Sequence, residues 1–342
     1  MSWIKNGVTI LFSTFIALFC AEILLRILDI GYGNAPLENS TKYHHVHPSN
    51  YNFLMHDPNA EYGGYYIYYD DLGFRVRNKT SQTFQFSDEE NAIIFLGDSF
   101  TEANQVTYDE TFVSLVGEEL GFPSVNFGVS TYSPLIYKLQ IENIVSRFLG
   151  NSVILQVFSN DFSGDMSYFH KAIFDGDKII GIDGGKIKNN ELIVLARNSY
   201  LLRFLRKSQL LIKKILSNSN TNTGKITSAF DYEQNITDSQ LKNTVKIIKH
   251  IKESLAKQGK KLYVFLIPSK SLSLNNNCCF DDTLYTRFYT ALKKVNINTI
   301  DVKSSFENID NQDKLFFEKD IHLTQHGHKV IANSIISHLR NE

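Results

Sequence analysis

The chain has 342 residues, of which 43% are hydrophobic, 13% aromatic and 21% charged, with a formal net charge of −1. These values fit a globular protein with a substantial core. No basic stripe dominates, which argues against nucleic-acid binding. The three cysteines are Cys20, Cys278 and Cys279. An adjacent pair rarely forms a disulfide and no Cys/His spacing suggests zinc, so we expect no disulfide framework, metal or cofactor.

The N-terminal residues 7–25 are almost entirely apolar, and a helix needs about 20 such residues to cross a bilayer. Glu22 and Arg26 are four residues apart and are expected to pair near the far interface. Trp3 and Lys5 precede the run, as interfacial anchors do. The segment therefore predicts an uncleaved transmembrane anchor, which makes the lipid bilayer a partner.

Two alternatives to the anchor stay open, a cleaved signal peptide and a buried core helix. The sequence Cys20-Ala21-Glu22 offers no convincing cleavage site. A slight excess of positive charge before the segment favours an N-terminus inside the cell. We therefore expect a single-pass protein of the cell membrane with an extracytoplasmic (periplasmic) catalytic domain.

The rest of the chain divides by its periodicity. After the anchor, assigned to residues 1–32, a segment at 33–90 begins with a stretch rich in Tyr, Asn, His and Gly and shows little periodicity. We predict that it is irregular and wraps over the core. Residues 91–342 carry an α/β pattern, interrupted by an insertion at about 165–235.

Strands and helices alternate along this last part. Strands are predicted at 92–97, 124–128, 152–158, 261–267 and 298–301, and helices at 109–120 (with Asp109 as cap), 134–148, 238–257, 282–294 and 324–339. Strand–turn–helix units in series imply a mainly parallel sheet with helices on both faces, an α/β fold.

The insertion breaks this rhythm. Asp175-Gly176-Asp177 and Asp183-Gly184-Gly185 predict hairpin turns. Residues 199–216 predict a strongly amphipathic, basic helix, and residues 217–227 a flexible polar stretch. The simplest expectation is a helix packed on the core, while a cap over the site and a helix on the membrane surface are alternatives.

Candidate catalytic groups follow the predicted strands. They are Gly97-Asp98-Ser99, Asn126-Phe127-Gly128, Asn160-Asp161 and Asp320-Ile321-His322. In open α/β sheets the reactive groups lie at the carboxyl ends of the strands. A serine hydroxyl needs an adjacent base, which His322 can supply, while Asp320 can orient and stabilise the imidazole. Gly97-Asp98-Ser99 alone would equally suit a turn.

Acyl transfer also needs donors for an oxyanion. The candidates are the backbone N–H groups of Ser99 and Gly128 and the side chain of Asn160. Without this chemistry Asn160 is a turn former, Gly128 a strand-end glycine and Asp320 a helix cap. His326 and His328 compete for the role of base, but their positions favour a helix face and a packing histidine. Asp98 and Asp161 are expected to be structural.

Taken together, the four blocks resemble those of the SGNH (GDSL-type) hydrolase family, in the same order and over roughly residues 90–340. The resemblance implies a flavodoxin-like three-layer α/β/α sandwich and hydrolysis, or occasionally transfer, of an acyl group. Two positions depart from the family pattern. Phe158 stands where a glycine usually precedes the asparagine by two residues, and Asp320 precedes the histidine by two residues where three are usual.

Three functions follow from this resemblance. The first is a membrane-anchored serine esterase that removes O-acyl groups, O-acetyl above all, from a glycan. The second is an O-acetyltransferase that uses Ser99, His322 and Asp320 to modify a cell-surface polysaccharide, served by a membrane partner that exports the acyl group. The third is a non-catalytic scaffold that retains the fold.

Overall fold

The computed structural model describes residues 2–28, 35–57, 61–185, 199–205, 208–209, 236–268, 270, 282–309 and 314–342. These residues form two compact units. One contains α1 (Ser2–Ile27) and the described residues between 199 and 209. The other contains the α/β domain. The adjacent cysteines Cys278 and Cys279 and the residues 217–227 lie outside the described residues.

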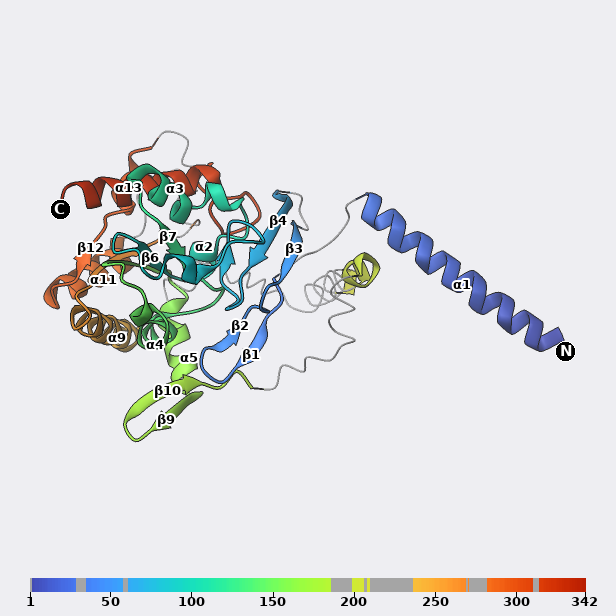
Figure 1. Ribbon diagram of the computed structural model, residues 1–342, viewed down its shortest axis with the longest axis horizontal. Helices are drawn as coiled ribbons and strands as arrows, with labels where there is room; N and C mark the ends of the chain where they lie inside the picture. The colour runs from blue at the N-terminus through green and yellow to red at the C-terminus, as the bar shows by residue number, and fades with distance from the viewer. Residues whose placement is uncertain are drawn as a thin grey trace, which may run out of the picture. The chain divides into compact units, whose positions relative to one another are not determined.

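A five-stranded parallel sheet forms the centre of the α/β domain (Figure 1), with the order β12-β11-β8-β6-β7. Its strands are β6 (Ile93–Leu96), β7 (Ser124–Asn126), β8 (Ser152–Val157), β11 (Lys261–Leu266) and β12 (Asn298–Thr299). The strands β6, β8 and β11 are short, largely apolar runs, and the five predicted strands are confirmed within a few residues. Because the strands are parallel, their carboxyl ends share one edge of the sheet.

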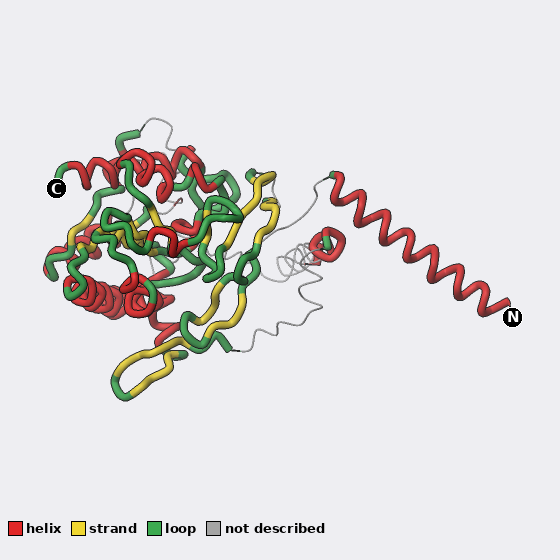
Figure 2. The backbone as a smooth tube through the Cα atoms, viewed as in Figure 1, coloured by secondary structure: helices red, strands yellow, loops and turns green. Residues whose placement is uncertain are grey.

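Helices cover both faces of this sheet (Figure 2). One face carries α4 (Pro134–Asn143), α5 (Asp161–Phe169), α9 (Asp238–Ala256) and α11 (Asp282–Lys294), and the other carries α3 (Phe112–Leu120), α12 (Lys303–Glu307) and α13 (Gln325–Arg340). The strands alternate accordingly: Val153 and Leu155 belong to the first core, and Ile154 between them belongs to the second. This confirms the predicted three-layer α/β/α fold.

Short helices complete these layers. They are α2 (Ser99–Glu102) and the 3-10 turns η1 (Thr83–Phe86), η2 (Tyr108–Glu110) and η3 (Val145–Arg147). The prediction that Asp109 caps the helix at 109–120 is wrong, because Asp109 lies inside η2 and the helix α3 begins at Phe112. Thr111 is the cap of α3, and its side chain accepts a hydrogen bond from the N–H of Ser114.

The N-terminal part of the wrapping segment is not irregular, which corrects that prediction. It contains β1 (Glu38–Ser40), β2 (His44–Val46), β3 (Asn52–His56), β4 (Gly63–Tyr69) and β5 (Arg75–Val76). The strands β1 and β2 form an antiparallel pair, and β3, β4 and β5 form a three-stranded sheet. The Tyr-rich run of β4 buries Ile67 and Tyr69, and its tyrosines and isoleucine are residues that favour a strand.

The insertion begins with a hairpin of β9 (Ala172–Asp175) and β10 (Lys178–Ile182). Its turn is at Asp175-Gly176-Asp177, as predicted, and Gly176 has a φ of 57°. Of the predicted basic helix at 199–216, the structure describes residues 199–205 and 208–209, and residues 200–205 are helical.

Candidate active site

The candidate nucleophile lies where β6 ends. The chain turns at Gly97 and starts α2 at Ser99. A side chain at Gly97 would overlap Thr101 and Gln156, so the turn requires glycine. Asp98 caps the turn, because its Oδ1 accepts the N–H of Phe100 at 3.0 Å. The cap fixes the backbone of the residue that carries the hydroxyl.

The structure brings the three predicted triad residues together. His322 Nε2 lies 2.8 Å from Ser99 Oγ, and His322 Nδ1 lies 2.5 Å from Asp320 Oδ1. The same Oδ1 accepts the backbone N–H of His322 at 2.9 Å. With the carboxylate on Nδ1, this network assigns the ring proton to Nδ1 and leaves Nε2 to accept from Ser99. A spacing of two residues is therefore sufficient for Asp320 to reach the imidazole.

Packing and one lysine support the loop that carries the histidine. Phe100 packs with its ring centroid 4.9 Å from that of His322 and 4.5 Å from that of Phe158. The side chain of Phe158 therefore packs behind the turn that carries Ser99. Lys270 Nζ donates to the carbonyl oxygen of Asp320 at 3.2 Å and also to that of Glu318.

The expected oxyanion donors differ in their present partners. The N–H of Gly128 donates to Asn126 Oδ1 at 2.9 Å, so in this structure it is already bonded. A side chain at Gly128 would overlap the backbone of Thr101 and Glu102, which explains the glycine by close approach. Asn160 directly precedes α5, and its buried Oδ1 has no hydrogen-bond partner among the described residues.

The loop that follows Gly128 is bonded to both sides of the nucleophile turn. The N–H of Val129 donates to the carbonyl of Gly97 at 3.2 Å, and the N–H of Ser130 donates to Glu102 Oε2 at 2.6 Å. Thr131 then has a φ of 67°, a conformation that a β-branched residue rarely adopts. Such strain costs about 1–3 kcal/mol and persists only where the surroundings hold it.

Glu102 is the centre of a buried network that sequence analysis did not identify. Its carboxylate is fully buried and contacts His47 Nε2 at 2.9 Å and Tyr69 Oη at 2.7 Å, besides the N–H of Ser130. Burial alone would raise the pKa of Glu102, but these partners lower it to about 2. The carboxylate therefore ties the nucleophile turn to β4 and to the chain just after β2.

Arg75 of β5 reinforces the same region. Its side chain is buried and donates to the carbonyl oxygens of Glu102 at 2.8 Å and Val106 at 2.7 Å, and also to that of Ala103. These carbonyls follow the last turn of α2, where Ala103 has a φ of 58°. Arg75 thus fixes the end of α2 from β5.

Asp98 in the turn and Asp161 and Asp165 of α5 are buried carboxyl groups. Burial raises the pKa of Asp98 to about 6, although the Phe100 N–H and His322 lower it. Burial also raises the pKa of Asp161 well above its usual value, and Asp98 and Asp165 raise it further. For Asp165, burial raises the pKa to about 6 against hydrogen bonds that lower it. These groups hold loops: Asp161 accepts the N–H of Phe158 at 3.3 Å.

Gln156 is a second residue that sequence analysis missed. Its Oε1 accepts from the N–H of Asp98 and from Thr101 Oγ1, both at 3.0 Å. A lone amide inside the apolar run 152–158 was the available signal. His328, by contrast, is confirmed as a packing residue, because it is buried beside Phe112 and burial lowers its pKa to about 3.

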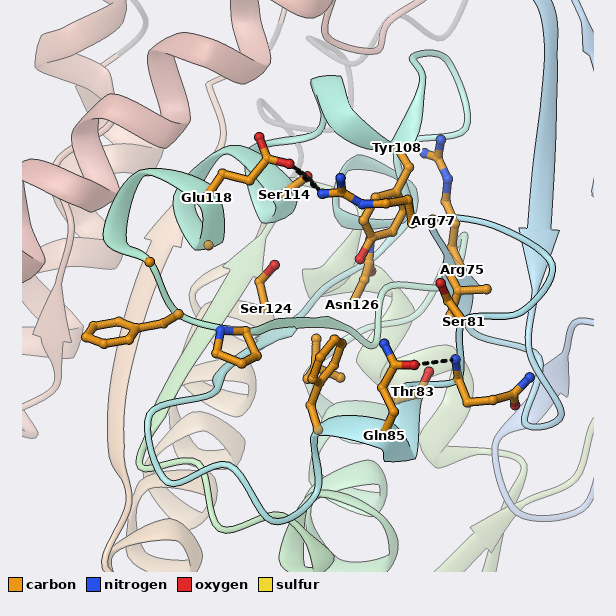
Figure 3. A pocket seen from close by; sticks show the side chains of 18 residues that line it. Arg75, Arg77, Ser81, Thr83, Gln85, Tyr108, Ser114, Glu118, Ser124 and Asn126 are labelled. Atoms are coloured by element: carbon orange, nitrogen blue, oxygen red, sulfur yellow. Dashed lines mark hydrogen bonds and ion pairs between the residues drawn. The ribbon is translucent and has the colours of Figure 1, made fainter.

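A cavity of about 510 Å³ lies along strand β7, apart from the triad (Figure 3). Arg77, Tyr108 and Glu118 line one side of it, and Gln85 lies on the other. Arg77 forms ion pairs with Glu118 and with Asp109, so its charge is compensated within the chain. The triad residues are not among its lining residues.

No group of three or more His, Cys, Asp or Glu side chains among the described residues is arranged to hold a metal ion.

Comparison with known protein families gives one match, over the C-terminal part of the chain. Residues 227–342 match the family model described as the SGNH hydrolase-like domain of the acetyltransferase AlgX. The matched part contains Asp320 and His322, while Ser99 precedes it. No curated protein sequence shows significant similarity to the chain.

Solved structures with a similar chain path include lipolytic proteins. A member of the lipolytic G-D-S-L family from Veillonella parvula is 13% identical, covers 72% of this chain and 96% of its own, and gives a TM-score of 0.41. A lipase/acylhydrolase from Enterococcus faecalis is 11% identical. The match covers 73% of this chain and 96% of the lipase/acylhydrolase, with a TM-score of 0.42. A GDSL-like lipase from Bacteroides thetaiotaomicron is 10% identical, covers 74% and 89%, and gives 0.40.

Proposed function

We propose that this chain is a membrane-anchored member of the SGNH (GDSL-type) hydrolase family, an enzyme that removes or transfers O-acyl groups, above all O-acetyl, on a glycan. The observation that carries the proposal is the continuous hydrogen-bonded path from Ser99 Oγ through His322 to Asp320, with distances of 2.8 and 2.5 Å. An unactivated serine is a poor nucleophile, and this path supplies the base and its orienting carboxylate.

In the proposed reaction, Ser99 Oγ attacks the carbonyl carbon of the ester while His322 Nε2 takes the hydroxyl proton. Asp320 stabilises the imidazolium that forms. When the tetrahedral intermediate collapses, His322 returns the proton to the departing alcohol oxygen and the acyl group stays on Ser99. A second hydroxyl, from water or a sugar, then gives its proton to His322 and attacks the carbonyl carbon of the acyl-enzyme. When this second intermediate collapses, the bond between Ser99 Oγ and the acyl carbon breaks, and His322 returns the proton to Ser99 Oγ.

The negative oxygen of each tetrahedral intermediate needs hydrogen-bond donors. We assign this role to the N–H of Ser99 and to the amide side chain of Asn160. Gly128 can add its N–H if the side chain of Asn126 releases it, since the two are bonded at 2.9 Å. One donor of this kind contributes about 10²–10³ in rate.

Esterase and acetyltransferase differ only in which hydroxyl clears the acyl group. One observation favours the second candidate: the family model that matches residues 227–342 is that of an acetyltransferase. In that case a membrane partner that exports the acyl group supplies the donor, and a cell-surface polysaccharide is the acceptor.

We propose further that α1 anchors the enzyme in the cell membrane with the catalytic domain outside the cytoplasm. Residues Lys5–Ile27 form a helix long and apolar enough to cross a bilayer, and none of its most apolar window is buried in the protein. The predicted ion pair between Glu22 and Arg26 is present at 2.7 Å. A signal sequence would show the same length and composition, and processing of the N-terminus distinguishes the two.

The test uses the full chain in detergent with p-nitrophenyl acetate. Release of p-nitrophenol is expected from the unmodified protein and is expected to be lost in Ser99→Ala. Ser146→Ala is a matched control, because Ser146 Oγ only donates to the carbonyl of Glu142 at 3.3 Å on the surface. Equal rates in Ser99→Ala and the unmodified protein would refute the nucleophile, and inactivity of both would favour a scaffold.

The acceptor is tested separately by adding an oligosaccharide to the same reaction. An acetylated oligosaccharide detected by mass spectrometry, absent with Ser99→Ala, identifies a transferase. Free acetate with no acetylated sugar identifies an esterase.

A further inference from the structure

Glu22 near the end of α1 has partners from a distant part of the chain. Its carboxylate accepts hydrogen bonds from Ser199 Oγ at 2.8 Å, from the N–H of Tyr200 at 3.0 Å and from the N–H of Leu201 at 2.8 Å. Arg26 forms an ion pair with the same carboxylate at 2.7 Å. The first turn of the helical residues 200–205 is therefore tied to the anchor helix.

The position of Glu22 along α1 sets the depth of this contact. The apolar helix runs from Lys5 to Ile27, and Glu22 lies five residues before its end. At 1.5 Å per residue this is about 7.5 Å inside the end of the span. An amphipathic helix on a membrane surface buries its apolar face about 5–10 Å into the boundary between headgroups and acyl chains. The two depths agree.

The tied segment has the side chains of such a helix. Leu202, Phe204 and Leu205 are 43%, 40% and 52% exposed, although all three are large and apolar. Arg203 lies among them, with its guanidinium 5.4 Å from the ring centre of Tyr200. Leu202 and Leu205 are three residues apart and lie on the same side of the helix, and exposed apolar side chains of this size suit an apolar environment.

The positive charge of the segment and the apolar surface of α1 beside it both point to a lipid bilayer as the partner of this segment. The sequence from 199 to 216 contains Arg203, Arg206, Lys207, Lys213 and Lys214 and no acidic residue. Basic segments beside a membrane span are attracted to anionic lipid headgroups. The exposed apolar residues 23, 24 and 27 of α1 lie on the turns around Glu22, so the apolar surface of α1 continues to the point of contact.

We propose that the segment from Ser199 to Leu205 is a second membrane contact of this protein, held in the headgroup region of an anionic bilayer at the end of α1. This inference rests on the proposed anchoring by α1. It makes the insertion a membrane-binding element, and Glu22 the residue that fixes its place.

The test measures quenching of tryptophan fluorescence by brominated phosphatidylcholine. The full chain is placed in vesicles of phosphatidylcholine and phosphatidylglycerol. Trp3 is the only tryptophan, so Trp3→Phe provides a background without signal. Phe204→Trp reports on the segment, and Phe174→Trp is the matched control, since Phe174 is also an exposed phenylalanine, 50% accessible, on β9 of the α/β domain.

We expect quenching in the Phe204→Trp variant to be several-fold stronger than in the Phe174→Trp variant. Adding Glu22→Ala is expected to reduce it, because the segment loses its tie to α1. Equal quenching in the two tryptophan variants overturns the proposal, and unchanged quenching after Glu22→Ala overturns the role of Glu22.

The unmodified protein separates this result from failure of the anchor or the enzyme. Quenching of Trp3 reports insertion of α1, so loss of that signal refutes the anchor, and with it the inference. Hydrolysis of p-nitrophenyl acetate in the same vesicles reports the catalytic domain, and neither Phe204→Trp nor Glu22→Ala is expected to change it.

Discussion

His328 is expected to make the stability of the protein depend on pH. Its ring is buried against Phe112, and Nδ1 accepts the N–H of Phe112 at 3.3 Å. Burial lowers the pKa of His328 from 6.5 to about 3. The unfolded chain therefore takes up a proton as the pH falls below 6.5, while the folded protein does not. Stability from this group is complete above pH 6.5 and is lost as the pH falls toward 3.

The magnitude follows from linkage. Each pH unit below 6.5 removes about 1.4 kcal/mol, so at pH 5 the free energy of unfolding falls by about 2 kcal/mol on account of this residue. Asparagine at 328 keeps an acceptor near the position of Nδ1 and does not titrate. In His328→Asn the difference in stability between pH 7.5 and pH 5 should therefore be about 2 kcal/mol smaller than in the unmodified protein.

The assay is urea unfolding of the full chain in detergent at the two pH values. Other buried groups titrate in this range, among them His45, whose pKa burial lowers to about 4, and Asp98 and Asp165. Because these groups are present in both proteins, they cancel when the two pH differences are compared. An unchanged pH difference in His328→Asn would show that the histidine is not neutral and buried as described.

Three further predictions concern the site and its supports. Asp320→Asn should lower kcat by about 10³-fold with little change in thermal stability, because the imidazole loses its orienting carboxylate; loss of stability in step with activity would contradict this. Gly128→Ala should lower the rate by about 10²-fold, because the new methyl group would lie 2.7 Å from the backbone carbon of Thr101. Gly164→Ala, whose nearest contact is 3.3 Å, is its control, and equal losses would exclude this cause. Glu102→Gln should lower the free energy of unfolding by about 3–5 kcal/mol, as for a broken buried ion pair. The half-exposed Glu118→Gln should cost at most about 1 kcal/mol, and a similar small cost for Glu102 would refute the network.

The central sheet could be predicted from sequence because its strands are locally marked. Runs such as 152–158 are apolar and end in turn residues, and the helices between them show a clear apolar face. The strands β1 to β5 lie in a stretch rich in Tyr, Asn and His that lacks such a continuous apolar run, and they depend on pairing with one another. Thr111 was missed as the cap of α3 for a similar reason, because an acidic residue two positions earlier satisfies the same local pattern.

The residues of the candidate site also fall into those that a local sequence motif predicts and those that depend on distant partners. Ser99, His322 and Asp320 could be proposed because each lies in a short motif beside a predicted strand or helix. Glu102, Gln156 and the other supports could not, because their roles depend on partners far away in the chain, such as Tyr69 for Glu102. The bond between Gly128 and Asn126 is local, yet only coordinates reveal which way the amide points.

The central claim is that Ser99 carries the acyl group between donor and acceptor. The most direct measurement is the intact mass of the full chain after brief reaction with p-nitrophenyl acetate and acid quenching, followed by peptide mapping. We predict a mass increase of one acetyl group, located on the peptide that contains Ser99, and no increase in Ser99→Ala. An acetyl group on another residue would contradict the account. So would a Ser99→Ala variant that carries no acetyl group and still hydrolyses the substrate.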